Sequence, residues 1–188
     1  MGFLSFGSKR DKLKKLLEEE RFDEVMLIVS KDKKARKDFL SLLDDENPGV
    51  RGDTLLTLSM LIEQNKNVFS DIIDEHLFKK LYSMMNTRNP YVRENAMILS
   101  SRMLKTFPEL VERYRDWLIE AIRKELREGD NFGRGFAIVA VGELRLKELV
   151  DDVEELTSVE DKVVLPFEGK KWVKIGDLAR ETLERLSE

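Results

Sequence analysis

The sequence predicts an all-α fold, an α–α superhelix (α-solenoid) of about four helix pairs with a small β-hairpin inserted in the last pair. A five-residue signature that contains a turn signal recurs three times between apolar helical segments. Its copies read Asn47-Pro48-Gly49-Val50-Arg51, Asn89-Pro90-Tyr91-Val92-Arg93 and, in degenerate form, Asp130-Asn131-Phe132-Gly133-Arg134. The two prolines lie 42 positions apart and the last two arginines 41 apart, an interval typical of helical repeats. Such repeats commonly present an extended surface to a partner.

Residues 1–41 precede the clear repeats and are expected to form capping helices. Leu13, Leu16 and Leu17 recur at helical spacing, and Val25 belongs to a second apolar segment. Terminal repeats of a solenoid need a face that does not stack on a further repeat, so they differ from the internal ones. This part of the chain therefore predicts one or two helices that close the first end of the array.

Residues 42–145 carry the clear repeats, each read as helix, turn and helix. Aligning the copies on their arginines places a small residue three positions later, followed by mostly apolar residues four and seven positions further on. The aligned residues are Thr54, Ala96, Ala137 and Ala179, then Leu58, Ser100, Val141 and Leu183, then Leu61, Met103, Leu144 and Leu186. Offsets of 0, 4 and 7 lie on one helix face, which is predicted to be buried. The proline of the signature fits the first helical position, where no hydrogen bond is lost.

Residues 146–188 form an atypical last repeat. Its two helices are expected at about 147–156 and 176–186, and Gly176 stands where the other copies have arginine. About twelve more residues separate these helices than separate the helices of the first repeat. The departure from the pattern is greatest here, so this segment is expected to distinguish the chain from other short solenoids.

The inserted residues predict a short β-hairpin at about 162–175. β-branched and aromatic residues stand on both sides of a turn that contains glycine, a pattern typical of two paired strands. One interpretation is that the hairpin folds over the end of the solenoid as a cap. The other is that it forms an interaction tip that displays Phe167 and Trp172.

The composition indicates one domain of 188 residues in a reducing compartment, and we expect a cytoplasmic protein. Cysteine is absent, which excludes disulfides, thiolate metal sites and a cysteine nucleophile. The longest apolar runs are too short to span a membrane. Charged residues make up 37% of the chain, which fits either adaptation to high temperature or solvated helix faces. The net charge of −4 by itself argues neither for nor against nucleic acid.

The signature resembles that of the HEAT-repeat family, in which Leu-x-Asp is followed by Asn-Pro-x-Val-Arg, a small residue and a leucine-rich helix. The closest variety is similar to the short prokaryotic and archaeal proteins grouped with phycobilisome-lyase-type repeats. This resemblance implies a helical solenoid and a structural arginine that pairs with acidic or polar groups of adjacent turns. Asp45 and Glu128 each stand six residues before a signature arginine, so bracing between repeats is the favoured interpretation. A basic row that binds a ligand is the alternative.

The residues offer little for catalysis, and we expect neither an enzyme nor a bound metal or cofactor. His76 is the single histidine, whereas metal sites need several convergent ligands. It is interpreted as a loop or helix-start residue. A serine nucleophile would lack a histidine base, and the Gly133-x-Gly135 pair is too short for a nucleotide-binding fingerprint.

The function expected from these features is that of a non-catalytic scaffold or adaptor that binds another protein. The candidate partner-binding residues are Arg51, Asp53, Arg93, Glu94 and Arg134 on the second helices, followed by Phe167 and Trp172 of the hairpin. The alternative is nucleic-acid binding, because HEAT-like alkylpurine DNA glycosylases hold duplex DNA in a basic groove. Basic residues in the middle repeats support that alternative, and the interleaved acidic residues and negative net charge oppose it.

Overall fold

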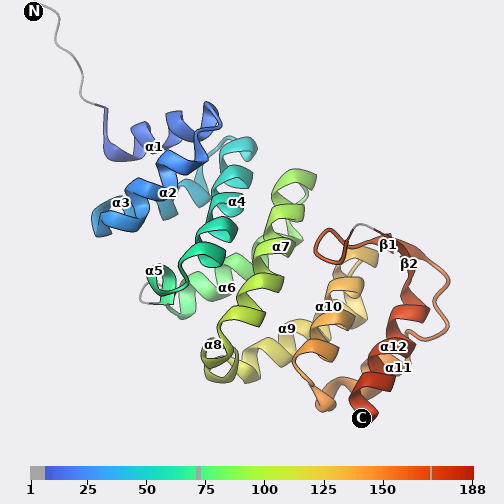
Figure 1. The fold of residues 1–188 in the computed structure, drawn as a ribbon. Coiled ribbons are helices and arrows are strands. Elements are labelled where there is room, and N and C mark those ends of the chain that lie inside the picture. The colour runs from blue at the N-terminus through green and yellow to red at the C-terminus, as the bar shows by residue number, and fades with distance from the viewer. Residues whose placement is uncertain (1–6, 71–72, 170) are drawn as a thin grey trace, which may run out of the picture. The chain divides into compact units, whose positions relative to one another are not determined.

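Helices form nearly all of the regular structure, and one two-stranded hairpin lies near the C-terminus (Figure 1). The computed structural model describes residues 7–70, 73–169 and 171–188. The predicted all-α class with its C-terminal hairpin is therefore confirmed. The chain divides into two compact units, Met1–Leu99 and Ser100–Glu188, with the boundary inside one long helix. No helix in the described ranges combines the length and the apolar character that crossing a membrane requires.

The first unit consists of helices joined by short turns. Its elements are α1 (Lys9–Glu18), α2 (Phe22–Lys31), α3 (Lys33–Leu40), the 3₁₀ turn η1 (Ser41–Asp44), α4 (Pro48–Gln64), α5 (Asn67–Ser70), α6 (Glu75–Ser83), the 3₁₀ turn η2 (Met84–Asn86) and α7 (Pro90–Thr106), which continues into the second unit. The core lies where α1, α2, α3 and α4 contact one another. It contains the fully buried side chains of Leu17, Phe39, Leu42 and Leu55.

The second unit contains the remaining helices and both strands. Its elements are α8 (Pro108–Arg113), α9 (Arg115–Glu128), α10 (Asn131–Glu143), the 3₁₀ turn η3 (Lys147–Leu149), α11 (Val150–Glu154), β1 (Lys162–Val164), β2 (Trp172–Lys174) and α12 (Ile175–Ser187). Helix α10 lies at the centre, in contact with α9, α12 and β1 (Figure 1). It is accordingly buried along most of its length.

The first residue of each signature caps the helix that follows it. The side-chain oxygen of Asn47 accepts a hydrogen bond from the Gly49 N–H at 2.9 Å, and that of Asn89 accepts one from Val92 at 3.1 Å. In the degenerate copy, Asp130 accepts from the Gly133 N–H at 3.0 Å. These bonds satisfy backbone donors that have no partner within the helix, so the signature marks helix starts for a local physical reason.

The predicted buried face of the second helices is largely confirmed. The small residues Thr54, Ala96, Ala137 and Ala179 are all fully buried. Most of the positions four and seven residues further on are buried as well, whereas Leu144 and Leu183 are half-buried. Leu144 directly follows the end of α10, and Leu183 lies four residues before the end of α12.

The two ends of the hairpin lie side by side next to the helices. In its antiparallel register Lys162 lies opposite Lys174, Val163 opposite Val173 and Val164 opposite Trp172. Two main-chain hydrogen bonds of 2.9 Å close its base, from Ile175 N–H to the Asp161 carbonyl and from Gly176 N–H to the Val159 carbonyl. The first helix of this repeat is shorter than expected, because residues 147–149 form a 3₁₀ turn and α11 ends at Glu154.

Gly176 replaces the signature arginine because the backbone of the inserted segment lies against α12. A Cβ atom at this position would lie 2.5 Å from the Thr157 carbonyl oxygen and 2.9 Å from that of Val159. One turn further along α12, the Arg180 guanidinium donates a hydrogen bond to the same Thr157 carbonyl. An arginine thus still contacts the segment that follows the first helix, displaced by one turn to make room for the backbone.

Candidate functional site

The three signature arginines bind main-chain carbonyls near the end of the preceding helix. Arg51 donates to the carbonyls of Asp45 at 2.7 Å and Glu46 at 3.2 Å. Arg93 donates from Nε to the Met85 carbonyl at 2.9 Å, and Arg134 donates to Arg127 at 3.3 Å. Carbonyls at a helix C-terminus lack partners within the helix and carry partial negative charge, so a guanidinium is favoured there. Each of these contacts joins the two helices of one pair.

Arg51 thus contacts the main chain of Asp45, a polar group of the adjacent turn, and not the Asp45 carboxylate. Asp45 has 4% of its surface exposed, and its carboxylate binds Arg10 at 2.9 Å and Lys14 at 3.1 Å, both on α1. Burial acts to raise the pKa of Asp45, but the Asn47 N–H, Lys14 and Arg10 together hold it below its usual value. The acidic side chain ties α1 to the first signature, and Arg51 acts through carbonyls instead.

Ion pairs between the first helices of consecutive repeats are formed by side chains outside the signature. In the first unit, Lys80 of α6 forms an ion pair with Asp44 of η1. In the second unit, Arg127 of α9 donates to buried Asp152 of α11 at 2.6 Å, and Arg115 forms a further pair with Glu148. These contacts link the first helices of consecutive pairs, the role that the sequence suggested for the signature arginines.

Asp53 and Tyr91 form a polar contact between two second helices. The Tyr91 hydroxyl donates to Asp53 Oδ1 at 2.6 Å, which joins α4 to the first turn of α7. The Tyr91 ring lies directly on Gly52, where a Cβ atom would be 2.2 Å from ring carbon Cδ1. Burial and the hydrogen bond to Asp53 raise the pKa of Tyr91 to about 12. Asp53, a predicted site residue, is thus paired with an aromatic side chain that the sequence reasoning left out.

The other candidate on α7 beside Arg93 is Glu94, which is exposed. Arg93 is half-buried and engaged with the η2 carbonyl, so it presents little of its charge to solvent. The sequence did contain a signal for Tyr91, since the variable position of the signature holds Gly49, Tyr91 and Phe132. The last two are 43% and 44% exposed and are among the few large apolar side chains that face solvent.

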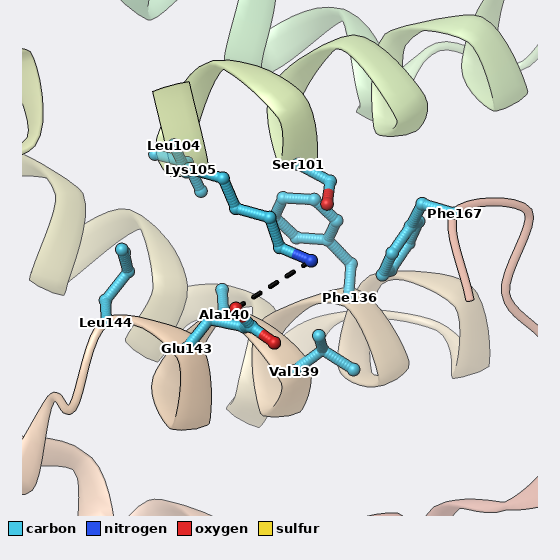
Figure 2. Close-up of a pocket in the computed structure, with 9 residues that line it drawn as sticks. All are labelled: Ser101, Leu104, Lys105, Phe136, Val139, Ala140, Glu143, Leu144 and Phe167. Carbon is cyan, nitrogen blue, oxygen red and sulfur yellow. Dashed lines mark ion pairs between the residues drawn. The ribbon is translucent and has the colours of Figure 1, made fainter. Parts of the chain in front are cut away.

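The hairpin loop packs on α10 through Phe167. The rings of Phe167 and Phe136 meet edge to face, with centroids 5.5 Å apart and planes at 77°. Figure 2 shows Phe167 reaching from the loop toward Phe136, beside Ser101 and Lys105 of α7. Lys105 Nζ lies 3.8 Å from a Glu143 carboxylate oxygen and 3.9 Å from one of Glu168. Two ion pairs therefore lie beside this pocket.

This pocket is too small for a substrate. The volume in which the centre of a water molecule can lie among its lining side chains is about 10 Å³, enough for about one water molecule. Its walls are mostly apolar, from Leu104, Val139 and Ala140. We interpret it as a packing imperfection between the hairpin loop and the helices, and Phe167 as an anchor of that loop.

Trp172 lies on the opposite side of the same hairpin and is 73% exposed. Alternation along the strands places Val163 inward, against α10, together with Leu165 just after β1. Trp172 and its cross-strand partner Val164 therefore face outward. The two interpretations of the hairpin, cap and tip, describe its two faces: the inner face packs and the outer face displays the tryptophan.

The histidine and acidic side chains of the described ranges are the groups that could together bind a metal ion. His76 is exposed in the first turn of α6, as expected for a helix-start residue. Within those ranges no three histidine or acidic side chains converge as metal ligands would. Comparison of the chain with models of protein families, with curated proteins and with solved structures found no match.

Proposed function

We propose that this chain is a non-catalytic adaptor of the HEAT-repeat type that binds another protein. Helix pairs braced by carbonyl-bound arginines form a rigid support, which suits presentation of side chains better than reaction chemistry. The observation that carries the proposal is the exposure of Trp172 on a hairpin whose other face is anchored.

The anchoring matters because a side chain held by a rigid element loses little conformational freedom on binding. Val163 and Leu165 are almost fully buried against α10, and Phe167 adds its contact with Phe136. Tryptophan is enriched among the residues that dominate protein–protein affinity, and its complete burial removes about 150–250 Å² from water. A 73% exposed tryptophan at a fixed position therefore offers most of that area to a partner.

The ion pairs of the second unit argue against the nucleic-acid alternative. Arg115, Arg123, Arg127 and Lys105 all form ion pairs with acidic side chains of the same unit. Binding to phosphates depends on cations that are not already neutralised, because affinity comes from the release of counterions. Some of the basic side chains that supported nucleic-acid binding in the sequence are thus already paired within the second unit.

Site-specific photo-crosslinking tests the proposal. A photoreactive phenylalanine analogue replaces Trp172, and the protein is irradiated in an extract of cells that express the chain. We expect discrete protein adducts that excess wild-type protein prevents and that excess Trp172→Ala does not. Leu27→Ala, which removes an exposed apolar side chain from the first unit, is the matched competitor and should compete like wild type. Adducts that disappear after nuclease treatment, or no competition by wild type, would refute protein binding through Trp172.

A further inference from the structure

The contact between Tyr91 and Asp53 forms a second partly exposed surface, within the first unit. Three constraints hold the Tyr91 side chain in place: its ring lies on Gly52, its hydroxyl donates to Asp53, and its residue follows Pro90 in the first turn of α7. The side chain nevertheless remains 43% exposed. An aromatic ring fixed in this way offers a face to solvent at little further cost in entropy.

The charges beside this ring are not compensated. Asp53 accepts a hydrogen bond from Tyr91 and, within the described ranges, pairs with no lysine or arginine. Arg51, two positions away on α4, donates to the carbonyls of Asp45 and Glu46 instead. Burial raises the pKa of Asp53, and the negative charge of Glu20 adds to that rise. Both carboxylates lie near Tyr91, and among the described residues neither forms an ion pair with a lysine or an arginine.

Glu20 stands in a conformation that few residues other than glycine adopt. Its φ is 58°, and its N–H and that of Arg21 close the end of α1 by donating to the carbonyls of Leu17 and Leu16. Glycine is the usual residue at such a helix end. Glutamate at this position therefore costs stability, while it adds a carboxylate to the surroundings of Asp53 and Tyr91.

We propose that Tyr91, Asp53 and Glu20 bind an arginine side chain of a partner protein. A guanidinium stacks on an aromatic face and donates paired hydrogen bonds to carboxylates, so both chemical groups of this surface are used at once. Lysine can supply the charge but neither the planar stacking nor the paired donors. The proposal rests on the proposed function in taking the ligand from a protein, and its site is separate from Trp172.

The experiment is an NMR titration of the ¹⁵N-labelled full chain with arginine amide at constant ionic strength. Citrulline amide, which has nearly the same shape without the charge, is the matched ligand control. We expect saturable shifts of the backbone signals of Gly52, Asp53 and Tyr91 with arginine amide, and none with citrulline amide. Lysine amide should bind several-fold more weakly. Equal shifts with arginine and citrulline, or no saturable shift at these residues, would overturn the proposal.

Variants separate this site from general attraction of a cation. Tyr91→Leu should weaken arginine binding about five-fold and Asp53→Asn about ten-fold. Glu63→Gln removes one negative charge from the same helix about 15 Å away and should change the affinity less than two-fold. An effect of Glu63→Gln as large as that of Asp53→Asn would refute a specific site. Loss of arginine binding with intact crosslinking at Trp172 would leave the proposed function standing, so the two failures are distinguishable.

Discussion

Introducing a side chain at position 176 should destabilise the protein, although the other repeats have arginine at the aligned position. In Gly176→Ala, the new Cβ would lie 2.5 Å and 2.9 Å from the carbonyl oxygens of Thr157 and Val159. Both are backbone atoms and cannot rotate away, so α12 and the base of the hairpin must separate. That separation weakens the two 2.9 Å hydrogen bonds from Ile175 and Gly176.

The expected loss of unfolding free energy in Gly176→Ala is the difference between a favourable and an unfavourable contribution. Alanine in a helix is favoured over glycine by up to about 1 kcal/mol. Two weakened hydrogen bonds, with the desolvation of groups left unpaired, cost about 3 kcal/mol. The net loss is about 2 kcal/mol, which for a chain of this length lowers Tm by about 4–8 °C. Gly176→Arg should lose at least as much, because its larger side chain meets the same carbonyls.

Thermal and urea unfolding followed by circular dichroism measure the effect, with Gly142→Ala as the matched control. Gly142 also lies in a helix of the second unit, but its nearest obstacle is the Thr182 side chain at 3.3 Å, which can move. We expect Gly142→Ala to stay within about 1 kcal/mol of wild type. If Gly176→Ala were as stable as wild type while the control behaved as expected, close backbone approach would not be the reason for the missing arginine.

Other predictions concern the ion pairs, the hairpin and the Tyr91 contact. Asp45→Asn should lower the unfolding free energy by about 2 kcal/mol at pH 7, because Arg10 and Lys14 lose their carboxylate. The folded-state pKa of Asp45 lies below the usual 3.8, so the difference in stability persists above pH 3.8 and disappears as the pH falls through the folded-state pKa. Urea unfolding of both proteins between pH 7 and pH 2 measures this difference. Equal stability of the two proteins at pH 7 would contradict the prediction. Trp172→Ala should leave Tm unchanged, whereas Leu165→Ala should cost about 3 kcal/mol in thermal unfolding; a comparable loss for both would mean that Trp172 packs. Asp53→Asn should keep or increase stability at pH 7, because the raised pKa of Asp53 means that folding disfavours its ionised form. The same substitution should lower the pKa of Tyr91 from about 12 toward 10, which NMR of the ring carbons would measure. An unchanged titration of Tyr91 would contradict the contact between the two side chains.

The arrangement of caps and core positions could be predicted because it depends on local physics. Asn47, Asn89 and Asp130 each accept a hydrogen bond from a backbone donor two or three residues later, whatever the rest of the chain does. The buried positions follow the helical period, so Thr54 and Ala137 could be assigned to the core from spacing alone. The hairpin was likewise visible in the order of β-branched residues and turn.

The partners of charged side chains could not be predicted from spacing. Asp45 precedes Arg51 by six residues, yet its carboxylate binds α1, about thirty positions earlier in the chain. A guanidinium can be satisfied by a carboxylate or by carbonyl oxygens, and helix packing decides which is within reach. The same holds for Asp53, whose partner Tyr91 comes from the next second helix.

The sequence by itself determined the class of the fold, the positions of the signature helix starts and the presence of the hairpin. Only the tertiary structure decided that the repeated arginines bind carbonyls and that Phe167 packs while Trp172 is exposed. It also decided that backbone carbonyls lie too close to position 176 for any residue but glycine. The physical reason is range: capping and periodicity act within one or two turns of helix. Exposure and hydrogen-bond partners are set by side chains and backbone that meet only after distant parts of the chain have packed.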